Sequence, residues 1–238
     1  MSMLLSPLRG TWKLGLMSRH HLGLFTSMSP ARFVPFDGMH GVCALARDEQ
    51  LRLVWCNEAY ASVCGRQMEQ LLGTTPHDVH PHELAEERAE RMRRVLQAGV
   101  TVSFYQFWRG LRWHTRIWPL EPGDYARAGC FIVMTPAVTA QPEDADRSPA
   151  VLIHQPDLGD LAVLSPRELE VFYYLASGMT VSETASTLFR SPKTVSRHAE
   201  RIHQKLGYRN RAELVTDAVR RGVVAFSPDD WRAMVEST

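Results

Sequence analysis

A short basic segment near the C-terminus carries the side chains best suited to binding an anion. Residues 190–211 include seven arginines and lysines and a single acid, Glu200, whereas the whole chain of 238 residues has a net charge of only +1. A local cluster of this kind is typical of a surface that contacts phosphate groups. A solvated helix face would explain the charges alone equally well, so the interpretation depends on the elements that carry them.

The segment 191–206 is predicted to be a helix that presents these charges on one side. Ser191 can cap the helix, and Pro192 fits its first position because the missing N–H would be unpaired there. On a period of 3.6 residues one stripe is apolar and the opposite face is polar. The apolar stripe is Val195, Ala199, Ile202 and Leu206, and the polar face is Lys193, Ser196, Arg197, Glu200, Arg201 and Gln204.

Three further helices are predicted around this one, over residues 164–178, 180–188 and 210–222. The first two open with capping boxes, Ser165-x-x-Glu168 and Thr180-x-x-Glu183. In a capping box the side chain of each of the two residues accepts a hydrogen bond from the backbone N–H of the other. Glycines close the first and the last. Four capped helices in about sixty residues, with a tight turn between the second and third, predict a helix-turn-helix domain.

Residues 164–215 closely resemble the LuxR/GerE-type DNA-binding domain, with its spacing kept without gaps. Thr184 and Arg190 depart from the family pattern, which usually has apolar residues there. The matching landmarks are Ser165-Pro166-Arg167-Glu168, Gly178, Glu183 with Ala185, Ser191, Lys193-Thr194-Val195, His198, Ile202 and Lys205-Leu206-Gly207.

This resemblance implies a sequence-specific transcriptional regulator whose helix 192–206 enters the major groove of double-stranded DNA. Arginine is suited to guanine, and glutamate accepts from the amino group of cytosine. The expected base-reading residues are Ser196, Arg197 and Glu200, and the expected phosphate contacts are Lys193, Thr194, Arg201 and Lys205.

Residues 37–136 are predicted to form a second, mixed domain with strands and helices. A long helix is expected over 81–99, with proline at its start, early glutamates, late arginines and a closing glycine. The predicted strands are 41–46, 51–56, 100–108, 111–120 and 129–135, with a polar turn at 47–50 and a short helical stretch at 57–65. In strand 111–120, Trp113, Thr115 and Ile117 should face the core, and Arg112, His114 and Arg116 should face solvent.

This order of elements, with landmarks at 54–60 and 71–73, resembles a PAS domain. The resemblance implies a five-stranded antiparallel sheet, with room for a ligand between sheet and helices and an outer sheet face that often dimerises. No cofactor is predicted, and a haem or flavin is left open. His77, His80 and His82 lie where haem sensors place an axial ligand, but histidine and proline before a helix are also ordinary. Cys56 and Cys64 are expected to be buried small hydrophobic residues rather than redox sensors.

The fold class is therefore predicted as α+β, a PAS-like antiparallel sheet with helices followed by an all-α four-helix helix-turn-helix domain. Residues 1–36 are interpreted as a poorly ordered leader, or as the product of a translation start placed too early. The predicted domains are 37–136 for sensing or dimerisation, a linker at 137–160, the helix-turn-helix domain at 161–226 and a short helix at 227–238. That terminal helix is expected to pack on the helix-turn-helix domain or on a second subunit.

The sequence also excludes several classes of protein. It has no nucleophile–base constellation, phosphate loop or metal-ligand spacing, so an enzyme is not expected. No apolar run reaches the ~18 residues of a membrane span, and the four scattered cysteines fit reduced thiols in a bacterial cytoplasmic, nucleoid-associated protein. The expected partners are DNA and a second copy of the chain, with RNA polymerase and an unknown small-molecule or protein signal as further candidates. The alternative is a protein-interaction module with only weak, non-specific DNA binding.

Overall fold

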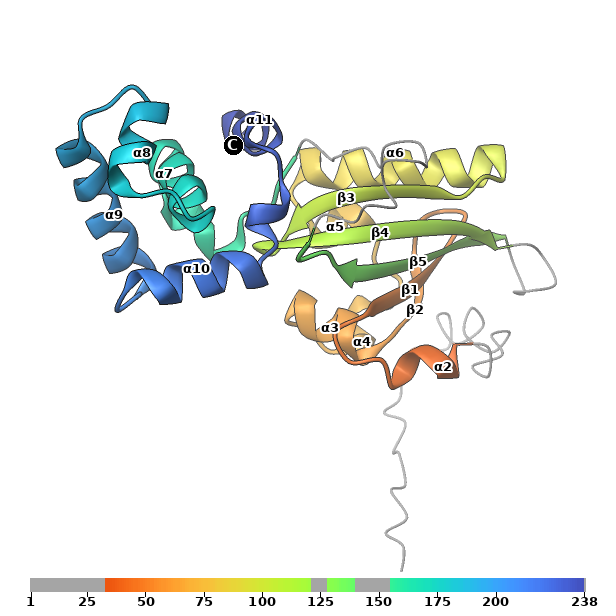
Figure 1. Cartoon of the computed structure of the whole chain (residues 1–238). Helices are drawn as coiled ribbons and strands as arrows, with labels where there is room; N and C mark the ends of the chain where they lie inside the picture. Colours follow the sequence, from red (N-terminus) through yellow and green to blue (C-terminus); the bar gives the residue numbers. More distant parts are fainter. Residues whose placement is uncertain (1–32, 121–127, 140–154, 238) are drawn as a thin grey trace, which may run out of the picture.

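The computed structural model describes residues 33–120, 128–139 and 155–237. An N-terminal domain of strands and helices lies beside a C-terminal helical domain (Figure 1), which confirms the predicted α+β class. Residues 1–32, with most of the predicted leader, and residues 140–154 of the predicted linker lie outside the described residues.

The N-terminal domain is built on a five-stranded antiparallel sheet, as the PAS resemblance implied. Its strand order is β2-β1-β5-β4-β3, so the first strand of the domain pairs with the last. The strands are β1 (Cys43–Asp48), β2 (Leu53–Cys56), β3 (Val102–Trp108), β4 (Leu111–Leu120) and β5 (Gly129–Pro136).

Helices cover one face of this sheet and enclose its core. Asn57 fixes the start of the first of them, because its side chain accepts hydrogen bonds from the backbone of Tyr60 and of Ala44 at 3.1 Å. The long helix was predicted to begin at Pro81, which is its N-cap, and it ends before Gly99 as expected. These helices are α3 (Glu58–Cys64), α4 (Met68–Leu71), α5 (Pro76–Val79) and α6 (His82–Ala98).

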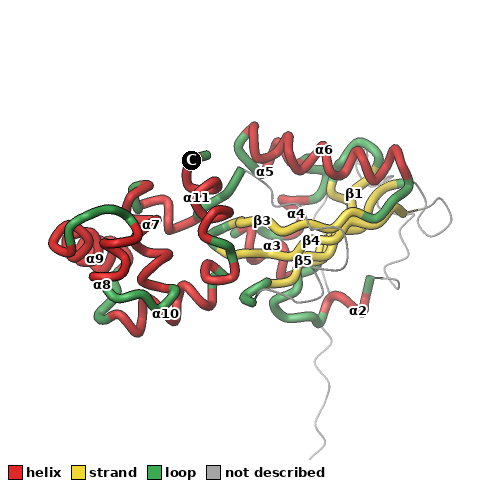
Figure 2. The backbone as a smooth tube through the Cα atoms, turned by 45° about the horizontal axis from the view of Figure 1, so that its top comes forward, coloured by secondary structure: helices red, strands yellow, loops and turns green. Residues whose placement is uncertain are grey.

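The other face of the sheet carries a small aromatic cluster beneath the short helix α2 (Val34–Asp37). Phe33 stacks on Trp55 at 4.7 Å and on Phe131 at 5.2 Å between ring centroids. Figure 2 shows α6 on one side of the strands and α2 on the other. Phe33 and Phe36, predicted as part of the leader, thus pack on the sheet, because their aromatic side chains have a surface to bury.

The predicted turn at 47–50 begins too early, because β1 continues through Arg47 and Asp48 and both side chains are buried. Arg47 Nη1 donates to the carbonyls of Leu51 and Thr74 at 2.7 Å. Asp48 accepts from the backbone N–H of Arg52 at 2.8 Å. Both side chains that suggested a turn are therefore hydrogen-bonded to backbone groups inside the domain, Arg47 through its Nη1.

The C-terminal domain contains the four predicted helices. The capping boxes at Ser165–Glu168 and Thr180–Glu183 are both formed, and the side chain of Asn210 caps the last of the four. The elements are η3 (Gly159–Val163), α7 (Pro166–Ala176), α8 (Val181–Thr187), α9 (Pro192–Leu206), α10 (Arg211–Arg220), η4 (Val223–Ala225) and α11 (Pro228–Glu236).

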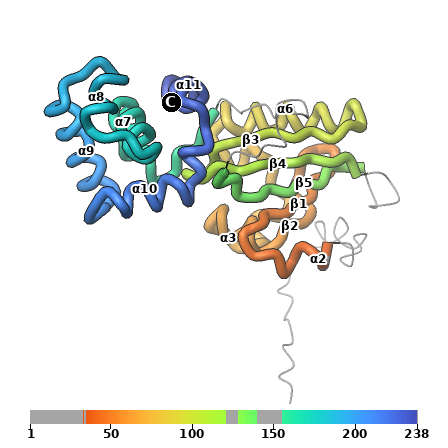
Figure 3. The backbone as a smooth tube through the Cα atoms, viewed as in Figure 1, coloured from red at the N-terminus to blue at the C-terminus, as the bar shows by residue number. Residues whose placement is uncertain are grey.

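The terminal helix α11 belongs to the core of this domain. Trp231 stacks on Tyr173 with ring centroids 5.7 Å apart, and its indole N–H donates to the carbonyl of Leu169 at 3.1 Å. Figure 3 shows α11 between the N-terminal domain and the rest of the helical domain, with α9 at the far end. Of the two packing partners expected for this helix, the structure shows the helix-turn-helix domain of the same chain.

Candidate nucleic-acid interface

Helix α9 is held by the two helices that precede it and presents one face outward. Val195 and Ile202 are fully buried in the core, whereas Ala199 and Leu206 pack at its edge. The tight turn from α8 into α9 passes through Phe189, which has a φ of +53° and is 90% exposed. Ser191 accepts from the backbone N–H of Thr194 at 3.2 Å and so starts the helix where predicted.

The exposed face of α9 carries the residues predicted to read bases. Arg197 and Glu200 are exposed, and Ser196 is half-buried beside them. Lys193 and Arg201, predicted to contact phosphates, are also exposed on this helix. Because α9 lies on the side of its domain away from the sheet (Figure 1), the N-terminal domain of the same chain does not cover this face.

The structure divides the basic cluster into two groups by their partners. Lys205, Arg209 and Arg211 bind acids or carbonyl groups within the protein. The remaining cations make no hydrogen bond or ion pair within the described ranges, so their charges are available to an external anion. This second group is Arg190, Lys193, Arg197 and Arg201.

Two predicted phosphate contacts already have partners inside the domain. Lys205 Nζ donates to the buried carboxylate of Glu168 at 2.7 Å and to the carbonyl of Val163 at 2.9 Å. This leaves the third N–H of Lys205 for a phosphate. The hydroxyl of Thr194 lies 2.9 Å from that of Ser191, so it too takes part in the helix cap.

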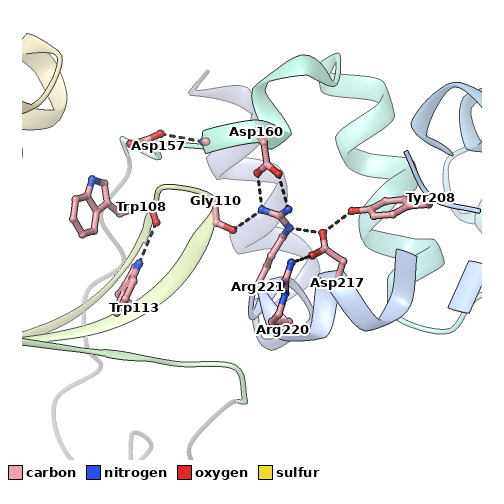
Figure 4. Close-up of polar contacts among 10 residues, drawn as sticks. Trp108, Gly110, Trp113, Asp157, Asp160, Tyr208, Asp217, Arg220 and Arg221 are labelled. Atoms are coloured by element: carbon pink, nitrogen blue, oxygen red, sulfur yellow. Dashed lines mark hydrogen bonds and ion pairs between the residues drawn. The ribbon is translucent and has the colours of Figure 1, made fainter. Parts of the chain in front are cut away.

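The two domains meet at a polar junction that the sequence did not reveal. Arg221, at the end of α10, donates to both carboxylate oxygens of Asp160 at 2.7 and 2.8 Å, and to the carbonyl of Gly110 at 3.3 Å. It also donates to Asp217, which accepts from the hydroxyl of Tyr208 (Figure 4). Burial alone would lower the pKa of Arg221, but the two carboxylates outweigh burial and raise it. The charged guanidinium of Arg221 thus links the β3–β4 hairpin to the helical domain through its hydrogen bond to Gly110.

Arg112 lies in this junction instead of facing solvent as the strand pattern predicted. Its guanidinium sits 3.9 Å from the ring centroid of Tyr105 and 5.2 Å from that of Phe226, and it donates to the carbonyl of Ala137 at 3.0 Å. The arginine is only 7% exposed. The face of β4 that was expected to be solvent-exposed is covered at Arg112, because the helical domain packs against it.

A second candidate site is a cavity between the sheet and helices α5 and α6. His80 lines this cavity, whereas His77 pairs with Glu86 at 2.9 Å and its ring centroid lies 5.7 Å from that of His82. The cavity measures about 30 Å³, which is far less than a haem would occupy. His80 contacts Trp108 edge-on at 5.7 Å.

The cysteines of the N-terminal domain are buried and free. Burial raises the pKa of Cys43 and Cys56 to about 12, with nearby Cys64 adding to the effect. Because the thiolate is the reactive form, the raised pKa leaves little reactive thiolate at neutral pH. Cys56 and Cys64 are thus buried in the core, as expected.

Neither a metal site nor a membrane span emerges from the described ranges. No group of three or more histidine, cysteine, aspartate or glutamate side chains is placed there to hold a metal ion. Within the same ranges, no helix has the length and apolar character needed to cross a bilayer.

Comparison with known proteins identifies both domains. The profile described as bacterial regulatory proteins, luxR family, matches residues 162–218, and the PAS-fold profile matches residues 36–136. The fold and the exposed α9 thus define a protein that joins a PAS domain to a LuxR-type helix-turn-helix domain. The spore germination protein GerE of Bacillus subtilis is 43% identical over 60 residues, which cover 25% of this chain and 81% of GerE. The chain belongs to the luxR family of bacterial regulatory proteins, a family of transcriptional regulators and not of enzymes.

Another relative matches over a similarly short stretch. A probable transcriptional regulatory protein NarL of Mycobacterium tuberculosis is 41% identical over 59 residues, which are 25% of this chain and 27% of that protein. The chain therefore spans about a quarter of the length of this relative. Among solved structures, a Vibrio cholerae VqmA–ligand–DNA complex is similar over 86% of this chain and 92% of that chain, with 19% identity and a TM-score of 0.45.

Proposed function

We propose that the whole chain is a sequence-specific, DNA-binding transcriptional regulator that inserts α9 into the major groove. The observation that carries this proposal is the exposed polar face of α9, where Arg197 has no partner among the described residues. An arginine held this way is free to make a bidentate contact with a guanine edge. The proposed base-reading residues are Ser196, Arg197 and Glu200, and the proposed phosphate contacts are Lys193, Thr194, Arg201 and Lys205.

The PAS domain is proposed to sense a signal, to dimerise, or to do both. One reading helix covers only a few base pairs, so we infer that two chains bind a paired half-site as a two-fold dimer. RNA polymerase is a further proposed partner, and the bacterial cytoplasm is the proposed location, since both follow from regulation of transcription.

Selection of bound sequences from a random DNA pool tests this function. Full-length protein is expected to enrich a paired motif and to retain the motif in the presence of excess competitor DNA. The alternative function, a protein-interaction module with weak DNA binding, predicts salt-sensitive binding and no enriched motif. A pool that remains random after several rounds of selection would therefore contradict the proposal and favour the alternative.

A further inference from the structure

The cavity of the PAS domain has a polar end and an apolar end. Arg47, Arg88 and His80 line the polar end, and residues of α6 and the sheet, including Met92 and Ile132, provide apolar walls. Its volume of about 30 Å³ is room for one or two water molecules. A ligand that fits the cavity as it stands is therefore very small.

The polar end contains hydrogen-bonding groups without partners. Arg47 Nε, Arg88 Nη2 and Trp108 Nε1 are buried donors that bind no other described atom. The three side chains are 1%, 6% and 1% exposed, so bulk water does not satisfy them either. An unsatisfied buried donor costs about 1–3 kcal/mol, and more if it is charged. One unpaired acceptor, Gln106 Oε1, lines the same cavity, so donors outnumber acceptors by three to one and indicate a ligand that mainly accepts hydrogen bonds.

Two arginines make this end positive, and the described carboxylates of Glu87 and Asp157 act on Arg88 without a direct ion pair. Neither Arg47 nor Arg88 forms an ion pair with a carboxylate in the described ranges. Burial lowers the pKa of Arg88 to about 10, which still leaves it protonated at neutral pH. Burial, with Arg88 and Arg47 close by, lowers the pKa of His80 to about 3, so this ring is neutral. An anion would supply the missing countercharge.

We propose that the cavity binds a small monocarboxylate of the size of formate or acetate, with its oxygens on Arg47, Arg88 and Trp108 and any methyl group toward the apolar walls. Arginine donors match the geometry of a carboxylate. The proposal rests on the proposed sensing role of the PAS domain, and it names the chemical class of the signal.

The same strand that lines the cavity also reaches the helical domain. Gln106 and Trp108 of β3 face the cavity, whereas Phe107 between them packs in the core of the helical domain. Phe107 lies 5.8 Å from Phe226 and 5.9 Å from Trp231 between ring centroids. A ligand on Trp108 therefore acts on a strand that also contacts the DNA-binding domain.

Calorimetric titration and thermal unfolding of the full-length protein test the proposal, with acetate, formate and the neutral isostere acetamide at constant ionic strength in chloride. Formate or acetate is expected to bind saturably and to raise the Tm by about 5–10 °C at a hundredfold excess over Kd. Acetamide is expected to give no shift. An equal response to acetamide, or no saturable response to either acid, would overturn the proposal without any variant.

Two variants of helix α6 test whether the carboxylate binds at the proposed cavity. Arg88→Gln removes the buried charge and is expected to lower carboxylate affinity at least tenfold, while Arg94→Gln, on the exposed side of the same helix, should retain it. Carboxylate binding by Arg88→Gln that is as tight as in the wild type would also contradict the proposed binding site.

Selection of DNA sequences with the same protein preparation distinguishes the carboxylate proposal from the DNA-binding proposal. Motif enrichment without carboxylate binding rejects only the ligand, and carboxylate binding without a motif rejects only the DNA-binding function.

Discussion

At the scale of single residues, the structure separates cations that stabilise the fold from cations that remain available to DNA. Lys205 belongs to the first group because it neutralises Glu168, whose side chain is 3% exposed, and only its third N–H is left for the proposed phosphate contact. Lys193 belongs to the second group, since no described residue is its hydrogen-bond or ion-pair partner. The two lysines lie on one helix, so they form a matched pair for mutation.

Lys205→Ala is expected to lower the free energy of unfolding by about 1–3 kcal/mol, because the buried Glu168 carboxylate loses its charged partner. Lys193→Ala is expected to leave stability unchanged and to reduce the slope of log affinity against log salt by about 1. Urea unfolding and DNA titrations at several salt concentrations measure the two effects. Equal stabilities for the two variants would contradict the assignment.

Acidification tests the same ion pair. Burial raises the pKa of Glu168, but Lys205 and Ser165 outweigh burial and hold it below its usual 4.5. A carboxyl group whose pKa is lowered by folding stabilises the protein above its unfolded pKa, and this stabilisation is lost as the pH falls through the folded value. The stability difference between wild type and Lys205→Ala should therefore be full above about pH 4.5 and shrink below it.

Thr184 departs from the family pattern, and the structure shows its consequence. The side chain is fully buried in α8 and its hydroxyl has no partner among the described atoms. Thr184→Val keeps the shape and removes the unpaired group, so it is expected to raise the free energy of unfolding by about 1 kcal/mol. Thr187→Val is the control, because that hydroxyl is paired with the carbonyl of Glu183 at 3.0 Å. Urea unfolding should show no gain for the control.

At the scale of elements, the sequence predicts helix boundaries correctly where residues a few positions apart determine them. The boxes at Ser165 and Thr180 work within one helical turn, so the helix starts could be predicted from a few neighbouring residues. Arg112 could not be placed in this way, because its burial depends on Phe226, which is far away in the chain. Arg88 was missed for a similar reason: a basic residue on a helix suggests a solvated face until the fold places it over a cavity.

The β3–β4 hairpin reaches the helical domain through a close backbone contact at Gly110. Its φ is +70°, and a Cβ there would lie 2.9 Å from Arg221 Nη1 and 2.9 Å from the carbonyl oxygen of Leu158. Gly110→Ala is therefore expected to cost about 2–4 kcal/mol. Gly99→Ala, at φ +64° with nothing within 4 Å of a Cβ, should cost only about 1–2 kcal/mol. Urea unfolding of both variants isolates the contact, and equal losses would show that the junction tolerates a side chain.

At the scale of the whole molecule, the two domains keep separate hydrophobic cores but are packed together, since Phe107 of β3 belongs to the core of the helical domain. The proposed reading helix α9 lies at the far end of the helical domain (Figure 1), so the PAS domain of the same chain does not cover the surface proposed to bind DNA. We propose that a signal in the PAS domain reaches DNA by changing the spacing between the two α9 helices of a dimer.

This arrangement predicts a defined stoichiometry on DNA. Two chains are expected per operator, with half-sites one helical turn apart or a multiple of it, about 10 base pairs centre to centre. Sedimentation of the protein–DNA complex gives the number of chains, and footprinting gives the spacing. A saturated complex with one chain per specific site would contradict the dimer.

The affinity of Arg197→Ala for its selected site and for random DNA tests base reading by α9 most directly. A loss of about 1–3 kcal/mol is expected on the selected site and a much smaller loss on random DNA, because a bidentate base contact is lost. Arg232→Ala, an exposed arginine on α11, is the control and should behave like the wild type on both. Equal losses on selected and random DNA for Arg197→Ala would contradict base reading by α9.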